Sequence, residues 1–119
     1  MDLEAIQRAV ENDIEIYVYV VTDAIGNAWT DARVEAELAA MRAALIAPYW
    51  AEVELRESYE QVTSCRAPSR TCAVVADDSR GNLVAFDPIE NEFLLLETRA
   101  HKLYSAGIRG DSVGCFMAR

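Results

Sequence analysis

The stretch from Thr71 to Thr98 constrains the fold of this chain more than any other part. Three short apolar runs follow one another there, TCAVVAD, NLVAFD and EFLLLET. The connections between them are short and rich in Asp, Gly, Asn and Pro, which are residue types that favour turns. Because short, turn-rich connections join neighbouring strands, the pattern predicts three antiparallel strands in consecutive hairpins.

The first of these connections has enough aspartates to resemble a cation-binding loop. A calcium loop needs oxygen ligands at positions one, three and five, glycine at six and glutamate at twelve. Counted from Asp77, glycine falls at five; counted from Asp78, Arg80 falls at three. Neither register fits, so we predict no metal site and no cofactor. We expect a turn, with Asp78 bonding nearby backbone and Gly81 or Asn82 at positive φ.

The second connection, DPIENE, has the composition of another turn. Asp87 suits its first position, and Asn91 suits a position that needs positive φ. The whole hairpin, Val74–Pro88, resembles a segment of the SUKH-type bacterial immunity superfamily, over about fifteen residues of the 119. The resemblance implies a small α+β domain that binds and neutralises a protein partner.

The first half of the chain alternates between helical and extended patterns. Apolar spacing predicts helices over residues 2–12 and 31–47, the second capped by Thr30 or Asp31 and ended by Pro48. The run IEIYVYVV, residues 14–21, is β-branched and aromatic and predicts a strand. The run WAEVELR, residues 50–56, alternates and predicts a half-buried strand. Strand, helix and strand in this order suggest a parallel crossover.

These elements add up to one α+β domain over residues 1–119, a length that one domain accommodates. We expect a two-layer sandwich: a mixed, mostly antiparallel sheet of about five strands with two helices on one face. The tail has three glycines and then VGCFMA, residues 113–118, which suggests a last strand.

The charge of the chain is uneven. Thirteen acidic and four basic side chains lie in residues 1–60, and seven of each follow, so the whole net charge of −9 lies in the first half. An acidic surface repels phosphate backbones, so we expect no nucleic-acid partner. The chain starts without a basic region before an apolar run, and its apolar runs are too short for a membrane span. A cytoplasmic location without membrane contact is therefore predicted.

The cysteine and histidine content argues against most catalytic chemistry. His101 is the only histidine, so a site with several histidines is excluded. Cys72 and Cys115 lie in apolar patterns that indicate buried thiols, and Cys65 and Cys72 could bridge only if oxidised. A Cys–His pair or paired glutamates remain open as catalytic groups, but we predict no catalytic residue and favour a binding protein over an enzyme.

The predicted sheet has a second face that no predicted helix covers. Large aromatics lie on it with charged neighbours, which is typical of interfaces. The candidate residues for an interface or a ligand site are Tyr17, Tyr19, Trp50, Glu15, Glu52, Glu54 and Arg56. We expect self-association, as a dimer, through this face. Two alternatives stay open: an immunity-like protein that docks a basic partner, and a pocket for a small amphipathic or cationic ligand. If the tail covers the face, the aromatics are ordinary core.

Overall fold

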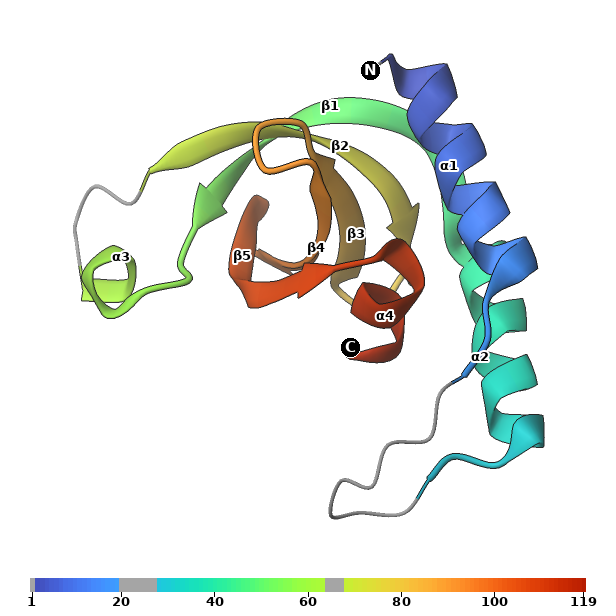
Figure 1. Cartoon of the computed structure of the whole chain (residues 1–119). Helices are drawn as coiled ribbons and strands as arrows, with labels where there is room; N and C mark the ends of the chain where they lie inside the picture. Colours follow the sequence, from blue (N-terminus) through green and yellow to red (C-terminus); the bar gives the residue numbers. More distant parts are fainter. Residues whose placement is uncertain (1, 20–27, 64–67) are drawn as a thin grey trace.

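The computed structural model describes residues 2–19, 28–63 and 68–119. Figure 1 shows a small barrel of strands with the two long helices on one side and the short helix of residues 59–63 on the opposite side. In chain order the elements are α1 (Leu3–Ile16), α2 (Asp31–Ala44), β1 (Leu45–Leu55), α3 (Tyr59–Thr63), β2 (Ser69–Asp77), β3 (Asn82–Asp87), β4 (Glu92–Arg99), β5 (Lys102–Gly110) and α4 (Ser112–Met117).

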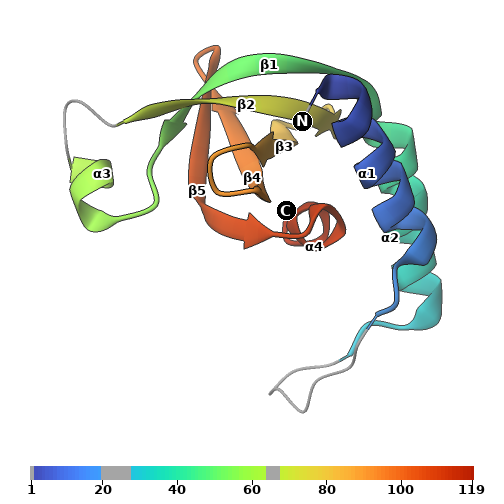
Figure 2. The ribbon, with the colours of Figure 1, turned by 45° about the horizontal axis from the view of Figure 1, so that its top comes forward.

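The five strands form a closed barrel in the order β1-β2-β3-β4-β5. Neighbours in sequence pair antiparallel, whereas β1 and β5 close the barrel as a parallel pair at Glu54↔Tyr104 and Leu55↔Ser105. The predicted α+β class and the five strands are confirmed. The two-layer sandwich with two helices on one face is wrong, because the sheet curls on itself and so removes most of its open edges (Figure 2).

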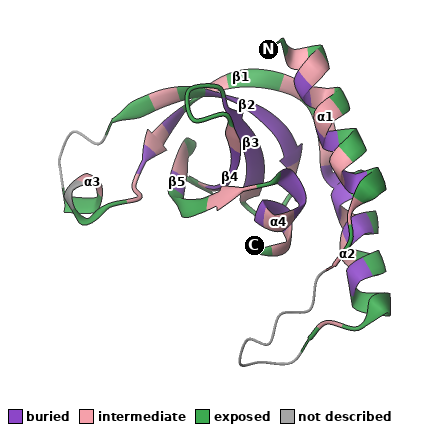
Figure 3. Ribbon diagram, viewed as in Figure 1, coloured by how far each residue is buried: buried purple, intermediate pink, exposed green. Residues whose placement is uncertain are grey.

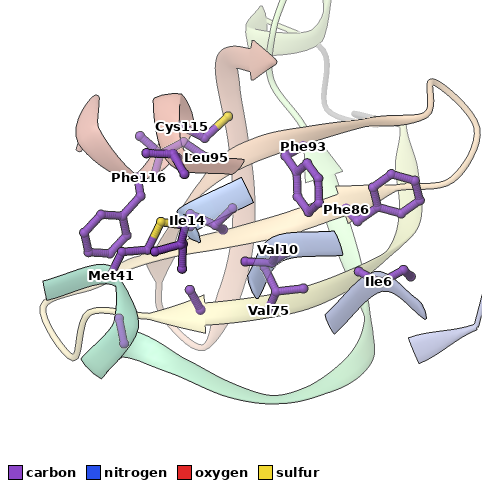
Figure 4. Close-up of a cluster of buried hydrophobic side chains, with 14 of the residues drawn as sticks. Ile6, Val10, Ile14, Met41, Val75, Phe86, Phe93, Leu95, Cys115 and Phe116 are labelled. Atoms are coloured by element: carbon purple, nitrogen blue, oxygen red, sulfur yellow. The ribbon is translucent and has the colours of Figure 1, made fainter. Parts of the chain in front are cut away.

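Two apolar clusters hold the barrel together. One consists of strand residues alone, with Val53, Val74, Leu94 and Leu96 fully buried, and it fills the barrel interior. The other, which we call the helix-side cluster, lies between the outer side of the strands and the helices (Figure 4). Its members include Ile6, Val10, Ile14, Met41, Phe86, Phe93 and Phe116. Where helices cover the barrel, successive residues of a strand therefore point alternately into the barrel interior and toward the helices. This explains the nearly continuous apolar runs of β2, β3 and β4 (Figure 3).

The first helix is longer than its sequence pattern predicts. Asp2 caps it by accepting a hydrogen bond from Ala5 N, and a buried stripe of Ile6, Val10 and Ile14 faces the barrel. The strand predicted over residues 14–21 is wrong in its described part. Residues 14–16 end α1, residues 17–19 belong to no helix or strand, and the rest lies outside the described residues.

The second helix is shorter than predicted, and the strand after it is longer. Thr30 accepts a hydrogen bond from Arg33 N, as expected of the cap, but the helix ends at Ala44 and β1 starts at Leu45. Pro48 therefore lies inside β1. The crossover predicted between two parallel strands is wrong, because residues 14–16 belong to α1 and residues 17–19 to no strand. The strand β1 pairs antiparallel with β2. The ladder between them is irregular between Leu45 and Tyr49.

The hairpins β2–β3 and β3–β4 form as predicted. Asp78 Oδ1 accepts hydrogen bonds from Arg80 N at 2.7 Å and Asn82 N at 3.1 Å. Gly81 has a φ of 92° and Asn91 a φ of 55°. Asp87 Oδ1 accepts from the backbone N of Ile89 at 2.9 Å. The aspartates of the β2–β3 connection therefore accept hydrogen bonds from the backbone N–H groups of the same turn.

The tail departs from its predicted strand. Residues 112–117 form α4, which Asp111 caps by accepting a hydrogen bond from Gly114 N. Val113 and Phe116 face the helix-side cluster at helical spacing. The last strand, β5, lies before this helix rather than within VGCFMA.

No helix in the described part of the chain is long and apolar enough to cross a membrane.

Candidate functional site

The structure divides the predicted site residues into two groups. Trp50, Glu52 and Glu54 share the outer side of β1, as their alternation predicts, and Arg56 follows directly after the strand. They lie opposite β2 residues at the same barrel surface, with Glu52 across from Thr71 and Glu54 across from Ser69.

The other predicted residues lie elsewhere. Tyr17 and Tyr19 follow α1 and pack, partly buried, against the helix-side cluster. Tyr19 Oη accepts a hydrogen bond from Trp29 N at 3.1 Å and its ring stacks on Trp29. Glu15 is exposed on α1. The predicted face that joins these residues with Trp50 therefore does not form, because the segment that carries them is not a strand of the sheet.

The outer surface of the barrel is only partly covered. Phe86 and Phe93 lie under the helices. The surface of β1, the adjoining part of β5 and the end of β4 carries exposed or half-exposed side chains instead (Figure 3). We call this uncovered region the bare barrel face; its members are Trp50, Glu52, Glu54, Arg56, Glu97, Arg99 and Tyr104. It contains four of the seven residues that the sequence places on an uncovered sheet face, namely Trp50, Glu52, Glu54 and Arg56.

Arginine contacts organise the centre of this face. The Arg56 guanidinium lies over the Tyr104 ring, 4.9 Å from the ring centroid, and donates to Glu54 at 3.3 Å. Arg99 donates to Glu97 at 3.0 Å. Both glutamates are therefore engaged by guanidinium groups, which leaves them less available as counter-charges for a cationic ligand.

Two neighbouring aromatic residues of β1 lie outside both apolar clusters. Tyr49 is 45% and Trp50 is 42% exposed, and neither belongs to an apolar cluster of the described residues. They are consecutive in a strand, so their side chains leave on opposite sides of it. Large exposed aromatics of this kind are enriched at protein interfaces.

A buried charge network lies at one mouth of the barrel, and the sequence does not reveal it. Asp87 accepts hydrogen bonds from Arg70 at 2.6 Å and Arg109 at 3.0 Å. Arg109 also donates to both carboxylate oxygens of Glu57. Only the turn role of Asp87 is visible in the sequence, because the three other partners come from distant strands and a loop.

This network anchors the segment between β1 and β2. We call residues 56–63, which include α3, the arm. Leu55 N donates to Pro68 O at 2.8 Å and closes the base of the loop. Gln61 Oε1 accepts from Glu57 N at 2.7 Å and Ser58 N at 3.1 Å. The Glu57–Arg109 pair then holds the arm against β5.

A cavity of about 320 Å³ separates the arm from the bare barrel face. Val62 of α3 lies on one side of it, and Tyr104, Ala106 and Arg99 lie on the other. Arg56 connects the two walls, since it starts the arm and stacks on Tyr104.

The two thiols in the described part of the chain offer no support for nucleophilic chemistry. Burial raises the pKa of Cys72 to about 11 and that of Cys115 to about 12. Both are buried, as the sequence predicts, whereas His101 is exposed in the β4–β5 turn. Cys65 and its predicted optional bridge to Cys72 lie outside the described residues.

Comparison of the chain with protein-family models, curated proteins and solved structures finds no match. The resemblance of the Val74–Pro88 hairpin to an immunity superfamily therefore rests on those residues alone.

Proposed function

We propose that the protein acts by binding and that it self-associates, as a dimer, through the part of β1 that carries Tyr49 and Trp50. The observation that supports this proposal is the exposure of two consecutive aromatics on a strand beside an uncovered barrel face. A side chain of this size buries about 150–250 Å² when it is fully covered. Because Tyr49 and Trp50 leave β1 on opposite sides, Trp50, which shares the outer side with Glu52 and Glu54, forms the centre of the contact, and Tyr49 lies at its margin. Glu52 and Glu54 would form the polar rim.

The contact is made by side chains rather than by pairing of strand edges. Among the described strands, β1 pairs with β5 only at Glu54 and Leu55, so its earlier part has an open edge. Pro48 lacks a backbone N–H there, and the ladder is irregular between Leu45 and Tyr49. Both features make an edge a poor template for another strand.

Charge distinguishes this proposal from the immunity-like alternative. Two copies with a net charge of −9 each repel one another, so added salt should strengthen self-association. Docking of a basic partner on the acidic first half should instead weaken with salt. The alternative is supported by the charge distribution and by the resemblance of one hairpin. It predicts no special role for Tyr49 and Trp50 in binding.

Size-exclusion chromatography with light scattering of two matched variants tests the proposal. Trp50→Glu places a charge in the proposed contact and should give a monomer. Tyr59→Glu makes the same kind of change at another exposed aromatic, on the arm, and should leave the dimer intact. A dimer that survives Trp50→Glu contradicts the proposal. A cytoplasmic location and the absence of a nucleic-acid partner stay predictions from composition.

A further inference from the structure

The cavity between the arm and the bare barrel face combines an aromatic wall with a cationic one. Tyr104 and the apolar side chains of Val62 and Ala106 offer surface to a flat ring. Val62 is 54% exposed, so a molecule in the cavity would cover apolar surface that now faces water. The guanidinium groups of Arg56 and Arg99 lie at the same cavity. Its volume of about 320 Å³ is near the lower end for ligand sites and suits a molecule with one ring.

Two buried polar atoms of the cavity lining, Arg56 Nε and Ser105 Oγ, have no hydrogen-bond partner among the described residues. Arg56 Nε is shielded from solvent, and no group of the described chain accepts its hydrogen. Another nitrogen of the same guanidinium reaches Glu54 at 3.3 Å, which is a long contact for an ion pair. Buried donors are nearly always paired in proteins, so an unpaired one indicates a missing acceptor. Carboxylate and phosphate groups have the acceptor geometry that a guanidinium matches, and of the two a carboxylate on a single ring suits the volume of this cavity.

The charges that face the cavity favour an anion over a cation. Glu97 is held by Arg99 at 3.0 Å, and Glu54 is held by Arg56. The cationic ligand that the sequence suggests would have to displace one of these arginines. An anion needs no such displacement, because Arg56 and Arg99 already line the cavity.

The arm that forms one wall is fixed in place before any ligand arrives. Arg109 binds Glu57 through two hydrogen bonds. The side chain of Gln61 accepts hydrogen bonds from the backbone N–H groups of Glu57 and Ser58. A preformed wall reduces the entropy lost on binding. We therefore propose that the cavity between Val62 and Tyr104 binds a small aromatic carboxylate, with Arg56 as the residue that recognises the carboxylate group.

Thermal unfolding of the whole chain in the presence of benzoate tests this proposal. A ligand that binds only the folded state raises the melting temperature in proportion to the logarithm of its concentration above Kd. We expect a rise with benzoate and none with benzamidine, which has the same ring and the opposite charge. An absence of any shift with benzoate at millimolar concentration overturns the proposal, and so does an equal shift with benzamidine.

Four variants locate the effect. Arg56→Lys keeps the charge but removes the Nε–H and the planar group, and should weaken benzoate binding at least tenfold. Arg33→Lys is the matched control, because Arg33 also lies over an aromatic ring, that of Trp29 at 4.0 Å, and it should bind benzoate like the wild type. Val62→Glu, at an exposed position, should also weaken binding through repulsion. Unchanged benzoate binding in both Arg56→Lys and Val62→Glu would refute the site. Trp50→Glu, at a position outside the cavity lining, should bind benzoate like the wild type.

Discussion

Asp87 and Arg109 are joined at the mouth of the barrel, where the fully buried carboxylate accepts a hydrogen bond from the guanidinium at 3.0 Å. Asp87 ends β3 and Arg109 lies near the end of β5, so the bond connects strands that are not neighbours in the barrel. Arg70 of β2 adds a second bond to the same carboxylate at 2.6 Å. Three strands are thus linked through one side chain.

Removing the charge of Asp87 should destabilise the fold. Asp87→Asn leaves two guanidinium groups with fewer counter-charges at a buried position, and breaking a buried pair costs about 3 kcal/mol. The free energy of unfolding from urea titration measures this loss. Glu90→Gln is the control, since Glu90 is 55% exposed and contacts the same Arg70 at 3.7 Å; its loss should stay under about 1 kcal/mol. Equal losses in the two variants would contradict the network.

The same network predicts a dependence of stability on pH. Burial alone would raise the pKa of Asp87 and of Glu57, but hydrogen bonds from Arg70 and Arg109 to Asp87 and from Arg109 to Glu57 outweigh it, so both pKa values are lowered. A carboxyl with a lowered folded pKa stabilises the fold above its unfolded pKa, and this contribution is lost as the pH falls through the folded value. The stability difference between wild type and Asp87→Asn should therefore be full above about pH 5 and shrink below about pH 4. A difference that grows toward acid pH would be inconsistent with this account.

The two buried thiols should resist modification in the folded protein. With pKa values of about 11 for Cys72 and about 12 for Cys115, few thiolates exist at neutral pH, and burial also blocks access. Treatment with iodoacetamide at pH 8, followed by peptide mass spectrometry, should leave both residues unlabelled. Denaturation in urea should expose both. Rapid labelling of either residue in the native state would show that its environment differs from the one described.

Local chemistry made the middle of the chain predictable. The turn residues Asp78, Gly81 and Asn91 act as their types suggest, and the apolar runs around them form β2, β3 and β4. Closure of the barrel could not be predicted in the same way. It depends on two residue pairs between β1 and β5, which lie about fifty residues apart in the sequence and leave no local pattern.

The errors at the two ends have a common physical cause. The run from Ile14 has strand propensity, but Ile14 continues the helical stripe of Ile6 and Val10 and is buried with it, so tertiary packing extends the helix. In the tail, Val113 and Phe116 face the same cluster at helical spacing, and Asp111 supplies the cap. The candidate site was accordingly half predictable. Trp50, Glu52, Glu54 and Arg56 stay together, whereas Tyr17 and Tyr19 lie elsewhere because their strand does not form.

Sedimentation velocity of the wild-type chain, over a range of concentration and from about 0.05 to about 0.5 M salt, tests the central claim most directly. The account predicts a monomer–dimer equilibrium that shifts toward dimer with concentration. Salt should shift it the same way, because screening weakens repulsion between two copies with a charge of −9 each. A single monomeric species under all these conditions, or a dimer that dissociates as salt is added, would contradict self-association through Tyr49 and Trp50.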